Sequence, residues 1–223
     1  MKAIILDIEG TTTDINFVHK VLFPYSAKKF PDFLKNNESN PEVVNVLNKI
    51  RQNYLKPDSS LDEILSLIQS WIDEDKKIGE LKSLQGMIWK DGFESKEYTS
   101  HLYDEVLDCL KDWKERGIDL YIYSSGSVQA QKLLFGHTIN GDVTVLFSGY
   151  FDTTVGGKKE STSYQNILNE IRLSGNEVLF LSDNEEELDA AKVVGVNTLH
   201  VNRDGLYEKS KHKIIENFKE VEL

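Results

Sequence analysis

The chain has 223 residues, of which 39% are hydrophobic and 28% charged, as is ordinary for a globular protein with one good core and a second, smaller one. Its formal net charge of -11 argues against nucleic acid and anionic membranes as main partners. The one cysteine, Cys109, excludes a disulfide within the chain, and no apolar run approaches the roughly 20 residues of a membrane span. No signal segment precedes the first strand, so we expect a cytoplasmic protein.

The first strand is predicted at residues 3–6, a short apolar run typical of a strand buried on both faces of a parallel sheet. Two carboxylates, Asp7 and Glu9, follow it, and the chain then turns at Gly10. Ligands of open α/β sheets bind beyond the carboxyl ends of strands, and alternate residues of an extended chain point the same way. Two carboxylates on such a turn suit a metal ion and a phosphate ester.

Residues 16–103 carry helical patterns and no clear strand signal. Pro24 is expected to break or kink the first helix, and Pro41 to open the second. Ser60 and Glu63 predict a capping box at the start of the third. Inserted just after the first strand, this segment is expected to be a helical cap domain. The catalytic core domain would then comprise residues 1–15 and 104–223.

The remaining chain alternates strands and helices. Strands are predicted near residues 120–123, 178–181 and 198–201, each at the end or start of a helical pattern, with a loop at 151–159. Residues 209–223 alternate charged and apolar residues and predict a C-terminal helix. Repeated strand–loop–helix units predict an α/β fold with a doubly wound parallel sheet.

Four candidate groups lie at strand ends or in adjacent loops, and they supply what phosphate-ester chemistry needs: a nucleophile, a proton donor, a metal site and donors to the phosphoryl oxygens. The groups are Asp7 with Glu9, Ser124 with Ser125, Lys158 or Lys159, and Asp183. Glu187 is either a further partner of this site or an acid favoured by the start of a helix. The five histidines show no metal-ligand spacing, and we expect none to be catalytic.

The order and spacing of these groups resemble the haloacid dehalogenase superfamily of aspartyl-phosphate hydrolases. Asp7, Glu9 and Thr11 match its first motif, Ser124 or Ser125 the second, a loop lysine the third and Asp183 the fourth. The insertion at residues 16–103 falls where that superfamily carries a helical cap.

Residues 6–12 further resemble the enolase-phosphatase family of methionine salvage, the acireductone synthases, in which the second acid of the motif is a glutamate. Residues 22–25, 84–89 and 122–135 agree with that family too. The resemblance implies conversion of 2,3-diketo-5-methylthiopentyl 1-phosphate to an acireductone and phosphate, by a monomer that carries one Mg²⁺.

The resemblance also implies a role for each matched residue. Asp7 would be the nucleophile and a Mg²⁺ ligand. Glu9 would be the proton donor, with its main-chain carbonyl on the metal, and could also be the base for enolisation. Asp183 would complete the metal site, while Ser124, Ser125 and Lys158 would bind the phosphoryl group.

Two alternatives stay open. A phosphatase of the same superfamily could act on another small phosphate monoester, because the cap selects the substrate. A receiver-like signalling module would instead keep the phosphorylated aspartate as its output. Receivers place that aspartate on a middle strand, however, whereas Asp7 follows the first strand.

Overall fold

The computed structural model describes residues 1–223, which divide into two compact units. The first, the α/β unit, comprises Met1–Ile15 and Thr99–Leu223, and the second, the helical unit, is Asn16–Tyr98. The helical unit thus ends five residues before the domain boundary at residue 103 that the sequence suggests. No helix in either unit has both the length and the apolar character needed to cross a membrane.

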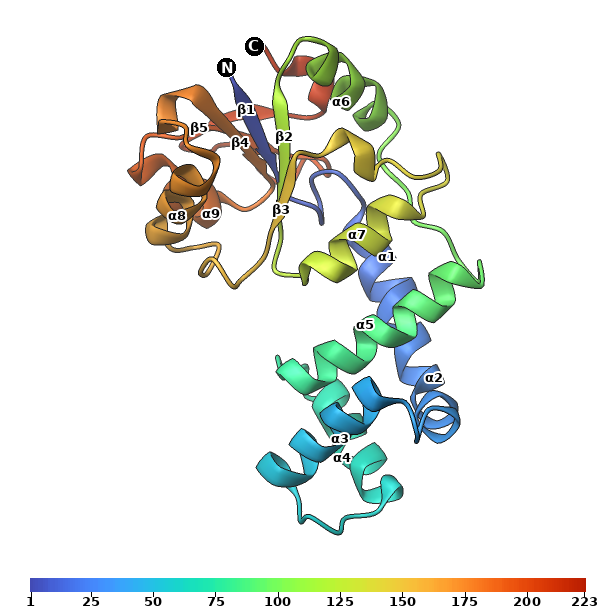
Figure 1. Ribbon diagram of the computed structural model, residues 1–223. Coiled ribbons are helices and arrows are strands. Elements are labelled where there is room, and N and C mark those ends of the chain that lie inside the picture. The colour runs from blue at the N-terminus through green and yellow to red at the C-terminus, as the bar shows by residue number, and fades with distance from the viewer. The chain divides into compact units, whose positions relative to one another are not determined.

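The α/β unit is built on one parallel sheet of six strands in the order β3-β2-β1-β4-β5-β6 (Figure 1). The central β1 pairs with β2 on one side and with β4 on the other, so that Leu6 lies between Ile122 and Leu181. The carboxyl ends of these three strands therefore meet at one edge of the sheet. The strands are β1 (Ala3–Leu6), β2 (Asp119–Tyr123), β3 (Gly149–Phe151), β4 (Val178–Ser182), β5 (Asn197–Val201) and β6 (Lys213–Ile215).

Helices cover both faces of the sheet, as the alternation of strands and helices predicts. Ile4 and Leu6 of β1 pack into a core with α6 (Val106–Glu115) and α7 (Val128–Gly136). Ala3 and Ile5 point the other way, into a core with α8 (Ser161–Ile171) and α9 (Glu185–Val193). All four residues of β1 are buried, which accounts for the unbroken apolar run. The predicted α/β fold with a doubly wound parallel sheet is confirmed.

The helical unit contains α1 (Ile15–Phe17), a π-helical turn at Val18–Leu22, α2 (Phe23–Asn36), α3 (Pro41–Tyr54), α4 (Leu61–Asp73) and α5 (Gly79–Glu94). Its core gathers buried side chains of α2 to α5, among them Phe30, Ile50, Ile64 and Leu84. The capping box is present: the main-chain N–H of Ser60 donates to Glu63 Oε2 at 2.7 Å, and the main-chain N–H of Glu63 to Ser60 Oγ at 3.2 Å.

Pro41 opens α3 as predicted, but Pro24 does not break its helix. It lies in the first turn of α2, directly after the π-helical turn Val18–Leu22, and the main chain keeps helical angles from Phe17 through Phe23.

One local prediction is wrong. Residues 213–215, predicted to be helical, form the edge strand β6, because the open edge of β5 supplies hydrogen-bond partners along its length. The following Phe218 packs against Trp113, with ring centroids 5.4 Å apart. The loop predicted at 151–159 is present, except that Phe151 is the last residue of β3, a three-residue strand that the sequence pattern did not predict. At residues 213–215 and in β3, pairing with a neighbouring strand overrides a local signal.

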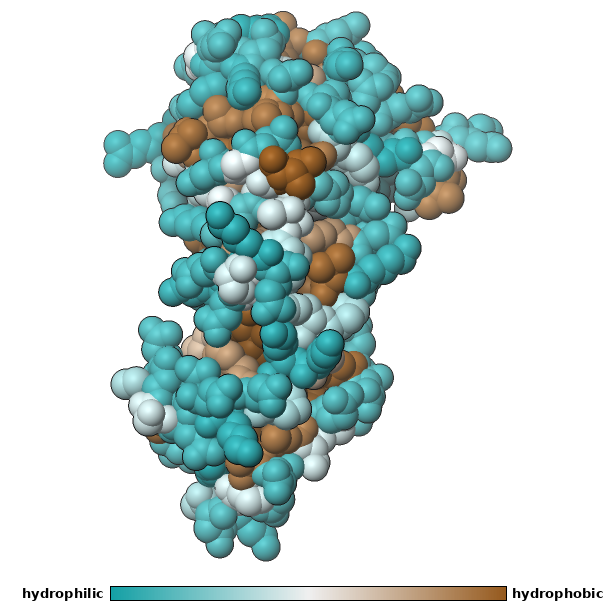
Figure 2. Space-filling model, turned by 90° about the vertical axis from the view of Figure 1, so that its right-hand side faces the viewer, coloured by the Kyte–Doolittle hydropathy of each residue, from teal (hydrophilic) through white to brown (hydrophobic).

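Hydrophilic residues cover most of the face shown in Figure 2, and apolar residues form several separate groups on it. This surface agrees with the high charged fraction of the sequence.

Candidate active site

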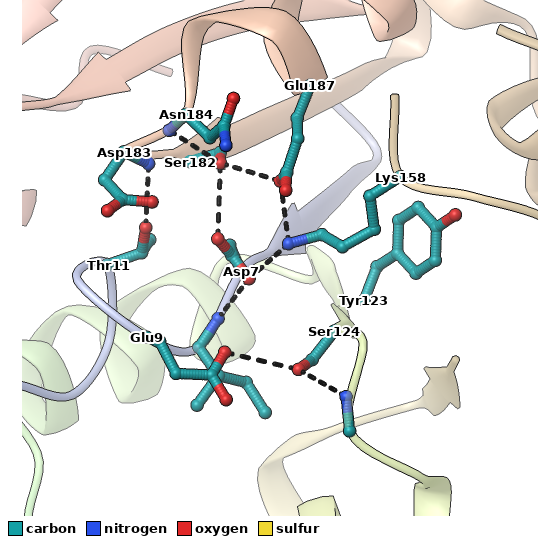
Figure 3. Close-up of polar contacts among 12 residues, drawn as sticks. Asp7, Glu9, Thr11, Tyr123, Ser124, Lys158, Ser182, Asp183, Asn184 and Glu187 are labelled. Carbon is teal, nitrogen blue, oxygen red and sulfur yellow. Dashed lines mark hydrogen bonds and ion pairs between the residues drawn. The ribbon is translucent and has the colours of Figure 1, made fainter. Parts of the chain in front are cut away.

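The predicted residues of the α/β unit converge at the carboxyl edge of the sheet (Figure 3). Asp7 directly follows β1, Ser124 follows β2 and Asp183 follows β4. Lys158 reaches the same place from the loop before α8. The structure therefore brings together Asp7, Glu9, Ser124, Lys158 and Asp183, whereas the side chain of Ser125 is exposed.

The loop after β1 is a compact turn. The carbonyl of Ile8 accepts hydrogen bonds from the main-chain N–H groups of Thr11, Thr12 and Thr13, and Gly10 N–H donates to the carbonyl of Thr13. Gly10 has a φ of +74°, and a Cβ at this position would lie 2.3 Å from Asp183 Oδ2. Glycine is required here for both reasons, since its backbone adopts positive φ without strain and leaves room for the carboxylate.

Asp7 is almost fully buried, and both of its oxygens have partners. Its Oδ1 accepts from Lys158 Nζ at 2.5 Å and from the main-chain N–H of Ile8 at 2.7 Å. Its Oδ2 accepts from the hydroxyl of Ser182 at 3.3 Å. These contacts hold the carboxylate in one orientation, as a nucleophile requires.

Lys158 lies between two carboxylates, with its Nζ 2.5 Å from Asp7 Oδ1 and 2.7 Å from Glu187 Oε2. Burial by itself would lower the pKa of this ammonium, but the two carboxylates raise it well above its ordinary value. Lys158 is therefore charged at neutral pH. The neighbouring Lys159 is exposed and pairs with Glu186.

Glu9 lies beside Ser124, whose hydroxyl donates to Glu9 Oε2 at 3.3 Å. The same hydroxyl accepts from the main-chain N–H of Gly126 at 3.1 Å. Burial, and then the negative charge of Asp7, raise the pKa of Glu9 above its ordinary value. A raised pKa suits a carboxyl group that exchanges protons with a substrate.

Asp183 is held through its main chain on two sides. Its N–H donates to Thr11 Oγ1 at 3.0 Å, and its carbonyl accepts from His200 Nε2 at 2.9 Å. Burial and the charges of Asp7 and Glu187 raise the pKa of the Asp183 carboxyl to about 7. The same causes, burial and then Asp7, raise the pKa of Glu187.

The carboxylates of the site outnumber the positive charge that faces them. Asp7, Glu9, Asp183 and Glu187 share one buried cation, Lys158. No group of three or more His, Cys, Asp or Glu side chains is arranged to hold a metal ion. Two side-chain carboxylates and a main-chain carbonyl, completed by water or phosphate oxygens, are nevertheless the hard donors that Mg²⁺ accepts. The residues present therefore fit this ion both in charge and in ligand type.

Sequence reasoning missed several residues that hold the site together. The hydroxyl of Ser182 bridges Asp7 Oδ2 and Glu187 Oε2, at 3.3 and 3.0 Å. Tyr164 donates to the carbonyl of Lys158 at 2.7 Å and so fixes the loop that carries the lysine. Ser182 could have been found from its place just before Asp183 at the strand end. Tyr164 belongs to an apolar helix stripe and gave no signal.

Glu187 combines the two interpretations that the sequence left open. It lies in the first turn of α9, where a helix favours acids, and it is buried against Lys158.

Comparison with known proteins gives three related findings. A family model described as haloacid dehalogenase-like hydrolase matches residues 1–195. The chain is 47% identical over 223 residues to a protein of Aquifex aeolicus named Enolase-phosphatase E1, covering 100% of both chains. It is 46% identical over 218 residues to the protein of that name from Erwinia tasmaniensis, covering 98% of this chain and 95% of the relative.

Two solved structures show the same fold. The UTR4 protein of Saccharomyces cerevisiae superposes with a TM-score of 0.85 at 36% identity, covering 99% of each chain. CbbY of Rhodobacter sphaeroides, in complex with phosphate, has a TM-score of 0.63 at 15% identity, over 99% of this chain and 96% of that one. At that identity the second likeness concerns the fold alone.

Proposed function

The chain belongs to the enolase-phosphatase family of haloacid dehalogenase-like hydrolases, and we propose that it converts 2,3-diketo-5-methylthiopentyl 1-phosphate to 1,2-dihydroxy-3-keto-5-methylthiopentene and phosphate in methionine salvage. The structural observation that carries this proposal is the buried pair of Asp7 and Lys158, with Glu9 and Ser124 beside it. A fixed carboxylate, a charged lysine and a protonatable acid are the groups that hydrolysis of a phosphate ester needs.

In the proposed hydrolysis, a carboxylate oxygen of Asp7 attacks phosphorus, and the bond from phosphorus to the substrate oxygen breaks. Glu9 donates a proton to that leaving oxygen, which its raised pKa favours. Water then attacks the aspartyl-phosphate and releases inorganic phosphate, with Glu9 now accepting a proton from the water. One water is consumed, and Asp7 and Glu9 return to their starting states.

Ser124 and Lys158 are the proposed donors to the phosphoryl oxygens. Their positions support this role, since the Ser124 hydroxyl and the Lys158 ammonium approach Glu9 and Asp7, the two acids on which the reaction depends. Ser125 is exposed beside Ser124 and is proposed as a further donor. Lys158 would balance the charge of the phosphate throughout the reaction.

One Mg²⁺ per subunit is proposed, held by the carboxylates of Asp7 and Asp183 and by the main-chain carbonyl of Glu9. When bound, it would supply positive charge to the phosphoryl group. The excess of buried carboxylates supports this assignment, because a divalent cation would offset the charge that raises the pKa of Asp183.

Enolisation must precede hydrolysis, and Glu9 is the proposed base that removes the proton from C1. The electron pair of the broken C1–H bond would form the C1–C2 double bond and leave a negative charge on the C2 oxygen, while the Glu9 carboxyl holds the proton that the leaving oxygen receives in the next step. The proton that Glu9 later takes from water would pass to the C2 oxygen, which gives the neutral enol and returns Glu9 to a carboxylate. Residues 16–103 are proposed as the cap domain that selects the substrate, and the enzyme is proposed to act as a cytoplasmic monomer.

The test is phosphate release from the diketo substrate and from a panel of sugar and glycolytic phosphates, with Mg²⁺ and with a chelator. Ultraviolet absorbance of the enol is followed in the same cuvette. We expect Mg²⁺-dependent release that prefers the diketone, with a transient or final enol signal. Release without that preference would instead support the alternative, a phosphatase acting on another small phosphate monoester. A long-lived phosphoprotein without turnover would support the receiver-like module.

A further inference from the structure

Arg203 is a buried arginine outside the residues with proposed roles in the reaction. It lies two residues beyond the end of β5, at the same edge of the sheet as the active site, and its side chain is only 8% exposed. Two of its N–H groups donate to one main-chain carbonyl, that of Thr11, with Nη2 at 2.8 Å and Nε at 3.2 Å. Thr11 belongs to the turn that follows Asp7 and Glu9.

The guanidinium is fixed on its other sides. Its Nη1 is 2.5 Å from Glu105 Oε1, and its Cζ lies 4.2 Å from the ring centroid of Tyr103 and 5.0 Å from that of Phe218. A planar guanidinium that stacks on rings and donates in a fork has one orientation, which a lysine ammonium could not reproduce. Its charge is balanced by Glu105, so its main effect on the active site is geometric.

Thr11 connects the fixed guanidinium of Arg203 to Asp183, the proposed metal ligand. The carbonyl of Thr11 accepts from Arg203, and its Oγ1 accepts from the main-chain N–H of Asp183. The Asp183 carboxylate in turn lies against Gly10, at the position that a Cβ would occupy. Arg203, Thr11 and Asp183 therefore form a continuous chain of contacts from a rigid cluster to a proposed metal ligand.

We propose that Arg203 is a positioning residue of this active site. It holds the turn at Thr11 so that the Asp183 carboxylate stays aligned with Asp7 for the divalent cation. This inference rests on the proposed function, because it assigns Arg203 a role in the metal site of that reaction.

The test replaces Arg203 by lysine, which keeps the charge beside Glu105 and loses the fork to Thr11. Binding of Mn²⁺, used as the probe for the Mg²⁺ site, is measured from the electron paramagnetic resonance signal of the free ion. Groups that orient metal ligands contribute about 10–100-fold in affinity, so we expect Arg203→Lys to weaken Mn²⁺ binding by about tenfold at least. We also expect kcat at low Mg²⁺ to fall and to recover as Mg²⁺ is raised, with little change in the KM of the phosphate substrate at saturating metal.

Two variants separate positioning from simple stabilisation. Glu105→Gln disturbs the same buried cluster but leaves the contact between Arg203 and Thr11, so it should lower the melting temperature with little effect on Mn²⁺ affinity. Arg116→Lys is the chemical control, because Arg116 also donates to a carboxylate and to a main-chain carbonyl, those of Asp112 and Leu223, outside the residues of the site. It should change neither Mn²⁺ affinity nor kcat.

Thr11→Val tests the same chain of contacts if Arg203→Lys fails to fold. It removes the acceptor of the Asp183 N–H and keeps the carbonyl that Arg203 contacts, and it should also weaken Mn²⁺ binding. Where both single variants fold, the effect of the double variant should be smaller than the sum of the two, because they act along one chain of contacts.

Wild-type Mn²⁺ affinity in folded Arg203→Lys would overturn the inference, and so would an equal loss of affinity in Glu105→Gln. Should Arg203→Lys not fold, wild-type affinity in Thr11→Val would overturn it. Failure of the proposed function has a different signature: the unmodified protein would itself release no phosphate from the diketone.

Discussion

The two units of the chain differ in what they bury. The buried polar side chains of the helical unit are Ser26, Ser59 and Gln85, and none of them is charged. The α/β unit buries Asp7, Lys158 and Glu187, together with His200 and His212. Burial of a charge is unfavourable unless the charge is paired and hydrogen-bonded, so a fold that needed only stability would avoid it.

In the helical unit, helix capping and apolar packing account for the core. Two of its helices, α3 and α4, begin at capping residues, Asn40 and Ser60, and the apolar faces of α2 to α5 meet in one core. In the α/β unit, by contrast, Asp7 and Glu187 contact one lysine, and burial, followed by the charges of these two acids, raises the pKa of Asp183 to about 7. This electrostatic cost is concentrated where we propose that the chemistry takes place.

The largest expected effect is that of Asp7→Asn on phosphate release. Loss of a catalytic nucleophile lowers kcat by on the order of 10⁵–10⁶-fold, while Lys158 keeps its ion pair with Glu187 and the protein should fold. Steady-state phosphate release and thermal unfolding measure the two effects. Asp58→Asn, at an exposed position in the helical unit, is the control and should retain full activity. Turnover of Asp7→Asn close to that of the unmodified protein would remove the proposed mechanism.

Glu9→Gln is expected to have the next largest effect. The amide can accept from Ser124 but cannot give up or take a proton, and general acid–base groups contribute about 10²–10⁴-fold in rate. Phosphate release at saturating substrate and Mg²⁺ measures this loss, with Mn²⁺ binding as the check that the metal site persists. A rate that does not change would mean that another group transfers the proton.

In the helical unit, substitutions of buried core residues should act mainly on stability. Ile64 is fully buried in α4, and Ile64→Ala should lower the free energy of unfolding by about 2–5 kcal/mol. Ile72→Ala, at a half-buried position near the end of the same helix, should have a smaller effect. Denaturant unfolding gives both values. If Ile64→Ala and Ile72→Ala lowered the free energy of unfolding equally, Ile64 would not be the more deeply buried core residue.

Gly10→Ala tests how closely the turn after β1 approaches Asp183. Positive φ costs a non-glycine residue about 1–2 kcal/mol, and the new Cβ would in addition meet Asp183 Oδ2. Gly117→Ala is a matched control, since Gly117 has a similar φ of +78° and no atom within 4 Å of a Cβ. Both variants should lose stability in thermal unfolding, Gly10→Ala more than Gly117→Ala, and only Gly10→Ala should also lose Mn²⁺ affinity. Unchanged Mn²⁺ binding in Gly10→Ala would contradict the proposed role of Asp183.

The smallest expected effect is a pH-dependent one. Burial alone would raise the pKa of Glu105, but hydrogen bonds from Arg203 and from the main-chain N–H of Phe218 bring it below its ordinary value. In the unfolded chain the Glu105 carboxyl has a pKa of about 4.3. Because its pKa is lower in the folded protein, Glu105 stabilises the fold at pH values above about 4.3. This stabilisation is lost as the pH falls through the pKa of Glu105 in the folded protein. The difference in melting temperature between the unmodified protein and Glu105→Gln should therefore shrink below about pH 4.

Glu63 provides the comparison for Glu105 in the helical unit. Its pKa is also lowered, by the main-chain N–H and then the hydroxyl of Ser60, but it is exposed to solvent. The pH-dependent difference for Glu63→Gln should be the smaller of the two, because water screens an exposed charge. A larger difference for Glu63→Gln would contradict the expectation that a buried carboxylate gains more from its hydrogen bonds than an exposed one does.

Much of this site could be predicted before the fold was known. Asp7, Glu9, Ser124 and Asp183 each follow a short apolar run, and parallel strands bring their carboxyl ends to one edge. The family resemblance favours Lys158 over Lys159, but the residues by themselves leave both open, because the two are adjacent in a loop. Only the structure distinguishes the buried lysine that contacts Asp7 from the exposed one that pairs with Glu186.

The sequence by itself determined the strand and helix pattern, the capped helices and the identity of the acids, because these depend on neighbours within a few residues. The tertiary structure decided which groups contact one another across long separations, such as Ser182 with Asp7 and Arg203 with Thr11. It also decided that residues 213–215 form a strand, since the edge of β5 provides hydrogen bonds that no local pattern encodes. Charge, burial and pKa follow from such distant contacts, and they arise only when the chain is folded.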